Sequence, residues 1–251
     1  MALVWIIGGT QESAALVRAL VASGIACIVT VTTESARSLY PSDPLVQIWV
    51  GRLQPESLLR FLQNHSVLCI VDASHPFAVA VSQMAIDASI KYQLPYLRYE
   101  RQSVASDGIH FSSFNALFAS DQLAGERVLL TIGYRPLMLF QPWQTRSTLF
   151  ARILPSQVAL ETALNAGFTP DRLIALRPPI SIDLERALWQ QWQISLVVTK
   201  ASGSAGGEDT KQQVANELGI SLIVIDRPPI QYPQQTQEIK AAIEFCQRCL
   251  S

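Results

Sequence analysis

The fold is decided by residues 3–12, which are Leu-Val-Trp-Ile-Ile-Gly-Gly-Thr-Gln-Glu. An unbroken run of five apolar residues predicts a strand that is buried on both faces, as in a parallel sheet. Two glycines close the run, and Ala14, Leu16, Val17 and Leu20 follow at helical spacing. A strand that turns through glycines into a helix is the first part of a β-α-β unit.

The same alternation of apolar runs and helical segments continues along the chain. In the first half we expect further strands over 25–31, 45–50, 67–72 and 94–99, and helices over 13–23, 55–64 and 77–92. In the second half we expect strands over 128–131, 149–154, 173–176, 196–199 and 222–225, and helical segments over 136–140, 156–166, 182–191, 209–218 and 235–250. Buried strands that alternate with helices predict parallel sheets covered on both faces, joined by right-handed crossovers.

A more polar and irregular stretch over residues 101–124 separates the two halves. We therefore predict an α/β protein made of two Rossmann-like parallel-sheet domains of five strands each, with a cleft between them. The N-terminal domain would span 1–105 and the C-terminal domain 106–251. A single ten-stranded sheet is the alternative arrangement.

The composition narrows the classes of partner. The chain has 251 residues, of which 49% are hydrophobic and 16% charged, so it can bury a substantial core. Its formal net charge of -1 gives no basic surplus for nucleic acid or an anionic membrane. No apolar run approaches the roughly 18 residues that span a bilayer, and the first residues resemble a strand more than a signal peptide. We expect a cytoplasmic protein, either a monomer or a small homo-oligomer.

The four cysteines do not predict a metal site. Cys27 and Cys69 lie in apolar runs, where a thiol is usually a small buried hydrophobe. Cys246 and Cys249 have metal or redox spacing, but no second pair accompanies them, so that function is a minor alternative. The chain also lacks His-Glu-x-x-His. Free thiols suit a reducing cytosol.

A candidate anion site follows the first strand. Gly8 and Gly9 allow close backbone approach and unusual φ, and Thr10 can cap the helix or bond a phosphate oxygen. The Gly-x-Gly-x-x-Gly fingerprint is not met, because alanine stands at the place of the third glycine. A tight turn with a threonine cap is the alternative interpretation.

Residues that could recognise the adenosine ribose of a dinucleotide follow the second strand. In dinucleotide folds an acid there favours the 2′-hydroxyl of NAD, and an arginine favours the 2′-phosphate of NADP. Glu34 is the acid that would favour NAD. The residues that would favour NADP are more numerous and outweigh it, namely Thr32, Thr33, Ser35 and Arg37. A solvated loop without such a role is the alternative.

A third candidate segment follows the fourth strand and contains Ser74, His75, Pro76 and Phe77. It falls where the carboxyl ends of parallel strands form a binding crevice. Ser74 and His75 can bond a pyrophosphate or a carboxylate, and Phe77 can stack on a flat ring. The alternative for His75 is a histidine that only caps a helix.

In the second half, small and polar residues follow a predicted strand at two places. Gly133 and Tyr134 follow its first strand, and Lys200, Ser202 and Gly203 follow its fourth in a glycine-rich loop. Each is a candidate contact for an anion or a nicotinamide. The order of a P-loop is not met. A connecting turn and a flexible linker are the respective alternatives.

Six motifs follow one another along nearly the whole chain: Gly-Gly-Thr-x-Glu at 8–12, Asp-Ala-Ser-His-Pro-Phe-Ala at 72–78, Leu-Arg-Tyr-Glu-Arg at 97–101, Leu-Thr-Ile-Gly at 130–133, Ala-Arg-Ile-Leu-Pro at 151–155 and Thr-Lys-Ala-Ser-Gly at 199–203. In this order they resemble the precorrin-6A reductase family, and the segment at 72–78 is the most specific. The resemblance implies hydride transfer from NADPH, with NADH possible, to a C=N-type unit of a tetrapyrrole polycarboxylate.

The resemblance and the candidate segments described above together suggest roles for residues. The N-terminal domain would bind the nicotinamide dinucleotide, and the C-terminal domain would contribute to the substrate cleft. His75, Tyr134 and Lys200 are the candidate proton donors, with water as the alternative. The cofactor-binding candidates are Gly8, Gly9, Thr10, Glu12, Thr32, Arg37, Ser74, His75, Pro76, Phe77, Gly133, Lys200, Ser202 and Gly203. Substrate carboxylates would be balanced by cations such as Arg37, Arg135, Arg152 and Lys200.

The chain departs from the family pattern in the second half. Ile132 stands where the family often has a second threonine, and Ala201 where it often has aspartate. Residues 177–181 are Arg-Pro-Pro-Ile-Ser where Gly-Pro-Phe-Ser is frequent. A nucleotide-binding regulatory module without chemistry is one competing function. A short-chain-like NAD(P)-dependent dehydrogenase is another, although the chain has no Tyr-x-x-x-Lys pair.

Overall fold

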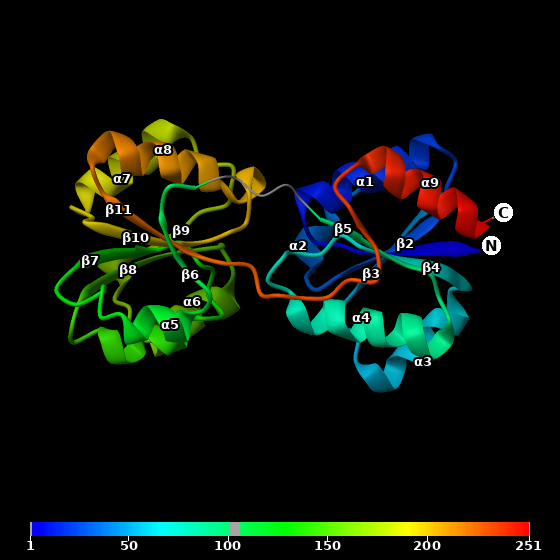
Figure 1. Cartoon of the computed structure of the whole chain (residues 1–251), viewed down its shortest axis with the longest axis horizontal. Coiled ribbons are helices and arrows are strands. Elements are labelled where there is room, and N and C mark those ends of the chain that lie inside the picture. Colours follow the sequence, from blue (N-terminus) through cyan, green and yellow to red (C-terminus); the bar gives the residue numbers. More distant parts are fainter. Residues whose placement is uncertain (1, 101–105, 251) are drawn as a thin grey trace. The chain divides into compact units, whose positions relative to one another are not determined.

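The computed structural model describes residues 2–100 and 106–250, which form two compact units (Figure 1). The first unit contains the described residues up to 100 together with those from 229 onward. The second contains residues 106–228. The predicted boundary at residue 105 and Arg101 of the motif at 97–101 fall outside the described residues.

The first unit is built on a six-stranded parallel sheet in the order β12-β5-β4-β1-β2-β3. Helices α1 and α9 cover one face of this sheet, and α3 and α4 cover the other (Figure 1). The strands are β1 (Leu3–Ile7), β2 (Cys27–Val31), β3 (Val46–Val50), β4 (Val67–Asp72), β5 (Tyr96–Tyr99) and β12 (Gln235–Thr236). The helices are α1 (Gln11–Ala22), α2 (Glu34–Arg37), α3 (Pro55–Asn64), α4 (Val79–Tyr92) and α9 (Ile239–Leu250).

The second unit is built on another six-stranded parallel sheet, in the order β6-β11-β10-β7-β8-β9. Helices α7 and α8 lie on one face, and α5 and α6 on the other (Figure 1). The strands are β6 (Ile109–Phe111), β7 (Arg127–Leu130), β8 (Thr148–Ile153), β9 (Leu173–Ala175), β10 (Leu196–Lys200) and β11 (Ser221–Ile225). The helices are α5 (Phe114–Ala119), α6 (Gln157–Asn165), α7 (Ile182–Gln191) and α8 (Glu208–Leu218), with 3₁₀ turns at Leu137–Trp143, Pro170–Arg172 and Ser204–Gly206.

These sheets confirm the α/β class and two separate parallel sheets, so the alternative of one ten-stranded sheet is wrong. The expected count of five strands per unit is also wrong. The short strands β6 and β12 escaped the sequence prediction because three and two residues are too few to show an apolar run.

The prediction that the second domain runs from 106 to 251 is wrong for the closing segment, which returns to the first unit. Strand β12 pairs with β5, where Gln235 lies opposite Arg98. Helix α9 then buries Ala242, Phe245 and Cys246 in the core beside α1. The physical reason is the apolar stripe of α9, which covers a face of the first sheet that α1 leaves partly open.

The cysteines behave as the sequence predicts, since Cys27 and Cys69 are buried and all four thiols are free. Cys246 and Cys249 place their thiols beside that of Cys69, and hydrogen bonding with Cys246 and burial raise the pKa of Cys69. Within residues 2–100 and 106–250, no group of His, Cys, Asp or Glu side chains is placed to hold a metal ion.

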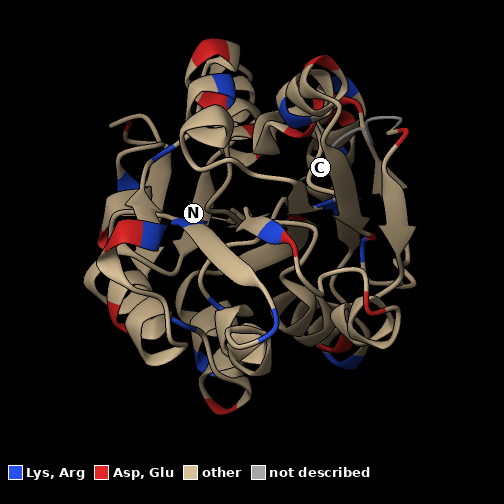
Figure 2. Cartoon of the chain, turned by 90° about the vertical axis from the view of Figure 1, so that its left-hand side faces the viewer, with Lys and Arg blue, Asp and Glu red and all other residues tan. Residues whose placement is uncertain are grey.

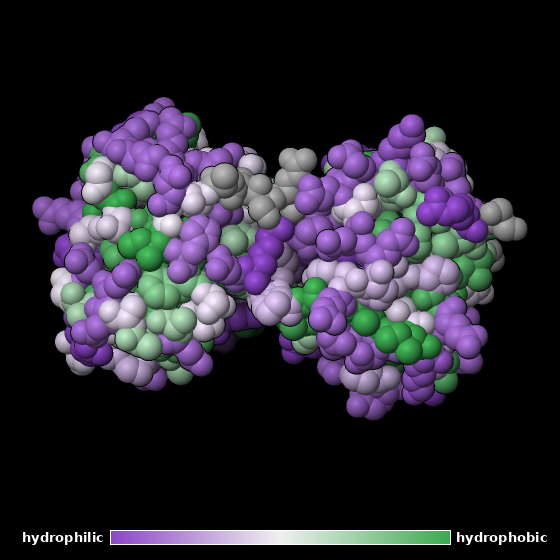
Figure 3. Space-filling view, in the orientation of Figure 1, coloured by the Kyte–Doolittle hydropathy of each residue, from purple (hydrophilic) through white to green (hydrophobic). Residues whose placement is uncertain are grey.

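Charged and apolar side chains are mixed on the faces of the molecule that Figure 2 and Figure 3 show. Basic and acidic residues lie close to one another along the helices (Figure 2). Apolar patches are interspersed with polar surface (Figure 3), and the exposed apolar side chains of the second unit include Met138, Leu139 and Val158. Of the helices that the structure describes, none has the length and apolar character to cross a membrane.

Both sheets reverse their winding at their centre. In the first unit the chain runs outward from β1 to β2 and β3, then starts again on the other side of β1 with β4 and β5. In the second unit β7 leads to β8 and β9, and β10 starts the other direction. At such switch points the loops that follow the two central strands diverge and leave a crevice for a ligand.

Candidate functional site

The candidate site of the first unit lies at its switch point, where the loops after β1 and β4 meet. Ile7 at the end of β1 lies opposite Asp72 at the end of β4, so both loops start at the same level. The hydroxyl of Thr10 donates to the main-chain oxygen of Ala73 over 3.0 Å and joins the loops. The predicted residues of the motifs at 8–12 and 72–78 are thereby brought together.

The loop after β1 is shaped by its two glycines. Gly9 has φ +100° and open space where a Cβ would stand, so a ligand can approach its backbone closely. A Cβ on Gly8 would instead lie 2.3 Å from the hydroxyl oxygen of Tyr40. Thr10 caps α1, because its hydroxyl accepts from the Ser13 N–H while the Ser13 hydroxyl accepts from the Thr10 N–H.

Tyr40 is a site residue that the sequence did not reveal. Its hydroxyl oxygen accepts from the Gly9 N–H over 2.6 Å and lies 2.7 Å from the Ser13 hydroxyl. Burial raises the pKa of Tyr40, so the phenol is neutral. One N–H of the glycine loop is therefore already bonded, and an anion at this loop would rely on the donors at the N-terminus of α1.

Of the ribose determinants after β2, Glu34, Ser35 and Arg37 lie on the short helix α2, and Thr32 and Thr33 precede it. Thr32 and Arg37 are exposed, and the Arg37 Nε atom forms an ion pair with the Glu34 carboxylate at 2.6 Å. The two residues that favour opposite cofactors therefore bind each other. Because Tyr40 follows α2 and contacts the glycine loop, this segment folds back toward the crevice.

The turn after β4 is held by buried charges. The Ser74 N–H donates to the Asp72 carboxylate over 3.0 Å, and Arg98 on β5 donates to both residues. Tyr96 donates its hydroxyl proton to the other Asp72 oxygen over 2.9 Å. Asp72, Ser74 and Arg98 are all buried. The signal for this network was an arginine in a buried strand, which requires a partner acid nearby.

His75 and Phe77 are the remaining candidate residues of the loop after β4. The Phe77 N–H donates to His75 Nδ1 over 3.2 Å, so Nε2 carries the proton of the neutral ring. The two rings lie 5.9 Å apart between centroids. Pro76 between them is buried, and α4 begins at Val79, two residues later than predicted. Glu12 lies half-buried in the first turn of α1.

The second unit brings the remaining predicted residues to its own switch point. Thr131 at the end of β7 donates from its main-chain N–H and its hydroxyl to the Val198 oxygen on β10, over 2.9 and 3.2 Å. Gly133 follows with φ +76°, and Tyr134 lies 5.8 Å from the Arg135 guanidinium.

Lys200 stands at the end of β10 with its amine 6.0 Å from the centre of the Phe114 ring. Burial and the charge of Arg135 lower the pKa of Lys200 to about 8. Two cations therefore lie close together at the carboxyl ends of the central strands. Such a pair favours an anionic ligand.

The glycine-rich loop after Lys200 is held by hydrogen bonds with buried side chains. The Gly203 N–H donates to the buried Glu208 carboxylate over 2.8 Å. Lys211 donates to the main-chain oxygens of Gly206 and Gly207 over 2.6 and 2.9 Å. A Cβ on Gly206 would overlap the Ser202 hydroxyl, so glycine is required there.

Arg152 does not fit the role of a carboxylate contact. Its side chain is largely buried in β8 and pairs with Glu185 on α7. That pair holds the strand to the helix from within the unit, so the prediction that Arg152 balances a substrate carboxylate is wrong.

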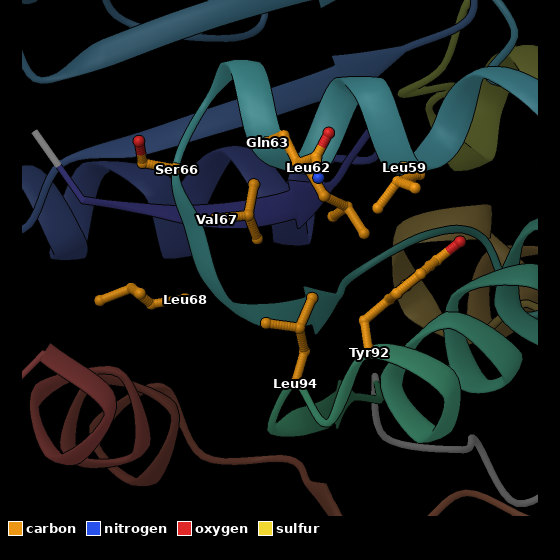
Figure 4. Close-up of a pocket in the computed structure, with 8 residues that line it drawn as sticks. All are labelled: Leu59, Leu62, Gln63, Ser66, Val67, Leu68, Tyr92 and Leu94. Atoms are coloured by element: carbon orange, nitrogen blue, oxygen red, sulfur yellow. The ribbon is translucent and has the colours of Figure 1, made fainter.

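An apolar pocket lies elsewhere in the first unit. It has a volume of about 270 Å³ and is lined by Leu59 and Leu62 of α3, Val67 of β4, and Tyr92 and Leu94 near β5 (Figure 4). These residues surround the amino end of β4, whereas the candidate site lies at its carboxyl end. The pocket is therefore separate from the loops that carry the candidate site residues.

The fold and the two switch points define a doubly wound α/β protein of the dinucleotide-binding kind. The family model of precorrin-6x reductase CbiJ/CobK matches residues 3–247. A cobalt-precorrin-6A reductase of Synechocystis sp. is 47% identical over 100% of this chain and 98% of its own. A precorrin-6A reductase of Rhodococcus erythropolis is 30% identical over 95% of this chain and 94% of its own.

A solved structure named CobK precorrin-6A reductase matches with a TM-score of 0.81 and 23% identity, covering 99% of this chain and 97% of its own. The chain belongs to the precorrin-6x reductase family. It is therefore an oxidoreductase of cobalamin biosynthesis, and a reductase of this family implies a nicotinamide cofactor. The resemblance noted from the sequence is confirmed, against a regulatory module and against a short-chain dehydrogenase.

Proposed function

We propose that this chain reduces precorrin-6A, or its cobalt complex, with hydride from NADPH bound at the switch point of the first unit. The observation that carries the proposal is the hydrogen bond from Thr10 to Ala73, which joins the two loops of the crevice in a member of a reductase family. The cofactor would supply the hydride, and the protein would hold and orient the reactants and handle the proton.

The first unit offers donors suited to a pyrophosphate. The open backbone at Gly9 and the N-terminus of α1 favour an anion. Thr10 joins this loop to the one after β4, where Ser74 and Pro76 lie. In that second loop the rings of His75 and Phe77 can pack on a flat ring of the cofactor. Gly8 acts indirectly, since it makes room for Tyr40. Glu12 suits a ribose hydroxyl, because a carboxylate accepts from hydroxyls and repels phosphate.

NADPH is preferred over NADH in this proposal because of Arg37. Its ion pair with Glu34 uses the Nε atom, and the pair is exposed, so it contributes little stability and can rearrange around a 2′-phosphate. Thr32 and Ser35 provide hydroxyls on the same segment. A guanidinium binds a phosphate in a bidentate manner, which the Glu34 carboxylate cannot do.

The second unit would bind carboxylates of the tetrapyrrole at its own switch point. Gly133, Ser202 and Gly203 provide small residues at the ends of the central strands, and Lys200 and Arg135 provide charge. Lys200 is the preferred proton donor among the three candidates, since a pKa of about 8 leaves it protonated at neutral pH and still able to release the proton. Tyr134 and His75 are the alternatives.

Turnover with a defined substrate tests this function. Wild-type protein should oxidise NADPH, followed at 340 nm, in the presence of precorrin-6A or cobalt-precorrin-6A, and more slowly with NADH. Arg37→Ala should raise the KM for NADPH by about tenfold or more and leave that for NADH nearly unchanged, since one charged contact is lost. Equal effects on both cofactors would remove Arg37 from the site, and no oxidation with either macrocycle would refute the proposed reaction.

A further inference from the structure

Arg98 lies inside the first unit with its guanidinium under the turn after β4. The residue is 1% exposed and belongs to β5, next to β4 in the sheet. Its main-chain N–H donates to the Gln234 oxygen over 2.8 Å, and the ring of Tyr232 lies 5.2 Å from its guanidinium carbon. The returning C-terminal segment therefore closes this side chain off from solvent, and no ligand can touch it directly.

The guanidinium holds Ser74 at two atoms. One terminal nitrogen, Nη1, donates to the Ser74 hydroxyl oxygen over 3.1 Å, and Nη2 donates to the Ser74 main-chain oxygen over 3.0 Å. The Nη1 atom also donates to the Asp72 carboxylate over 2.9 Å. This carboxylate accepts in turn from the Ser74 N–H. The position of Ser74 is thus fixed by three hydrogen bonds within one ionic network.

These bonds change what the turn can offer to a ligand. The main-chain oxygens of Ala73 and Ser74 are occupied by Thr10 and Arg98, so neither repels an anion in the crevice as a bare carbonyl would. A hydroxyl oxygen that accepts from a guanidinium keeps its own proton for donation. The other hydroxyl near it, on Ser82, is 3.5 Å away, at the outer limit of a hydrogen bond.

Two carboxylates balance the positive charge of Arg98. Asp72 accepts from Nη1, and Glu100 accepts from Nε over 2.8 Å. Burial and the neighbouring Asp72 raise the pKa of Tyr96, so this phenol is a neutral donor to Asp72. The network therefore needs no ligand for its own stability, and it is formed before a ligand binds.

We propose that Arg98 is a positioning residue that directs the Ser74 hydroxyl, as a donor, toward phosphate oxygens of the bound dinucleotide. The inference rests on the proposed function, because it needs the cofactor in the first unit. According to this inference, Arg98 raises the affinity for the cofactor through Ser74, and Arg98 itself does not contact the cofactor.

Four variants separate positioning from mere stability. Arg98→Lys keeps a positive charge for Asp72 and Glu100 but loses the fork that holds Ser74. Ser74→Ala removes the hydroxyl, and Ser74→Thr restores it. Tyr96→Phe is the matched control, since it removes a buried hydrogen bond to Asp72 and leaves every bond between Arg98 and Ser74 in place. Each variant is compared for melting temperature, NADPH dissociation constant, KM and kcat.

We expect Arg98→Lys and Ser74→Ala to weaken NADPH binding by about tenfold or more, the loss typical of one hydrogen bond to a charged group. The value of kcat at saturating NADPH should change far less than KM. Ser74→Thr and Tyr96→Phe should bind NADPH nearly as tightly as wild type, although Tyr96→Phe lowers the melting temperature. Normal affinity in folded Arg98→Lys, or an equal loss in Tyr96→Phe, would overturn the inference.

Two further outcomes are decisive. If Arg98→Lys does not fold, the pair Ser74→Ala and Ser74→Thr still decides, because normal affinity in Ser74→Ala contradicts any action through that hydroxyl. If wild-type protein binds neither NADPH nor NADH, the proposed function itself fails and the inference fails with it. That result differs from wild-type binding that the Arg98 and Ser74 variants leave unchanged.

Discussion

Thr10 donates its hydroxyl proton to the main-chain oxygen of Ala73, 3.0 Å away and 63 residues later in the chain. The same hydroxyl oxygen accepts from the Ser13 N–H and caps α1. One side chain thus fixes the start of the first helix and the turn after β4. In the second unit Thr131 similarly bonds the Val198 oxygen across the two central strands.

Thr10→Val should lower stability and cofactor affinity together. The variant keeps the shape of the side chain but loses an N-cap, worth about 0.5–2 kcal/mol, and leaves the buried Ala73 oxygen without its donor, at about 1–3 kcal/mol. Urea unfolding followed by circular dichroism measures the loss. Thr10→Ser keeps the hydroxyl and should stay close to wild type. Equal stability of Thr10→Val and wild type would contradict the role of this bond.

Gly8→Ala should destabilise the first unit through Tyr40. The new Cβ would lie 2.3 Å from the Tyr40 hydroxyl oxygen and 2.7 Å from a Val29 methyl, which forces an overpacking cost of about 1–3 kcal/mol. Removing the hydroxyl in Gly8→Ala/Tyr40→Phe should recover part of the loss. A double-mutant cycle with zero coupling would show that the two side chains do not meet.

Phe245→Ala should destabilise the first unit and leave the second intact. Phe245 is 5% exposed in the core beside α1, and such a truncation costs about 3–5 kcal/mol. Amide hydrogen exchange should show faster exchange in β4 and β5 and normal exchange in β10. Lys240→Ala, at an exposed position of the same helix, serves as control. Faster exchange in β10 instead would contradict the assignment of α9.

The parts of the fold that the sequence predicted are those with a strong local pattern. The structure confirms the strands Leu3–Ile7 and Val67–Asp72, which are apolar runs. It also confirms the helix Pro55–Asn64, whose apolar residues have clear helical spacing. Strand β12 was not predicted, because its two residues join the sheet only by pairing with β5. Gln235 lies opposite Arg98, which is 137 positions earlier in the chain. Such long-range pairing leaves no trace in local periodicity.

The candidate site was likewise predictable only in part. Glycines, Thr10 and Ser74 follow apolar runs, and that position alone points to a crevice. Tyr40 and Arg98 were missed, because their roles depend on hydrogen bonds to Gly9 and Ser74 that no spacing indicates. Lys211 and Glu208 lie on what looks like a polar helix start, and only the structure shows them buried under the glycine-rich loop.

The pH dependence of turnover should report Lys200. Burial and Arg135 lower its pKa to about 8, so its ammonium form predominates below that pH and is lost above it. We expect kcat to fall as the pH rises through about 8. If Lys200 donates the proton, Lys200→Arg should lower the chemical step by roughly 10²–10⁴-fold at every pH. If only charge is needed, Lys200→Arg should retain activity and lose the alkaline fall. A flat wild-type profile from pH 7 to about 9.5 would exclude both roles.

The location of the cofactor is tested most directly by amide hydrogen exchange of the wild-type protein with and without saturating NADPH. Our account predicts that NADPH slows exchange at residues 8–13 and 73–77, the two loops that Thr10 and Ala73 join. Protection confined to residues 131–135 and 200–207, with none in the first unit, would contradict it and place the cofactor at the other switch point.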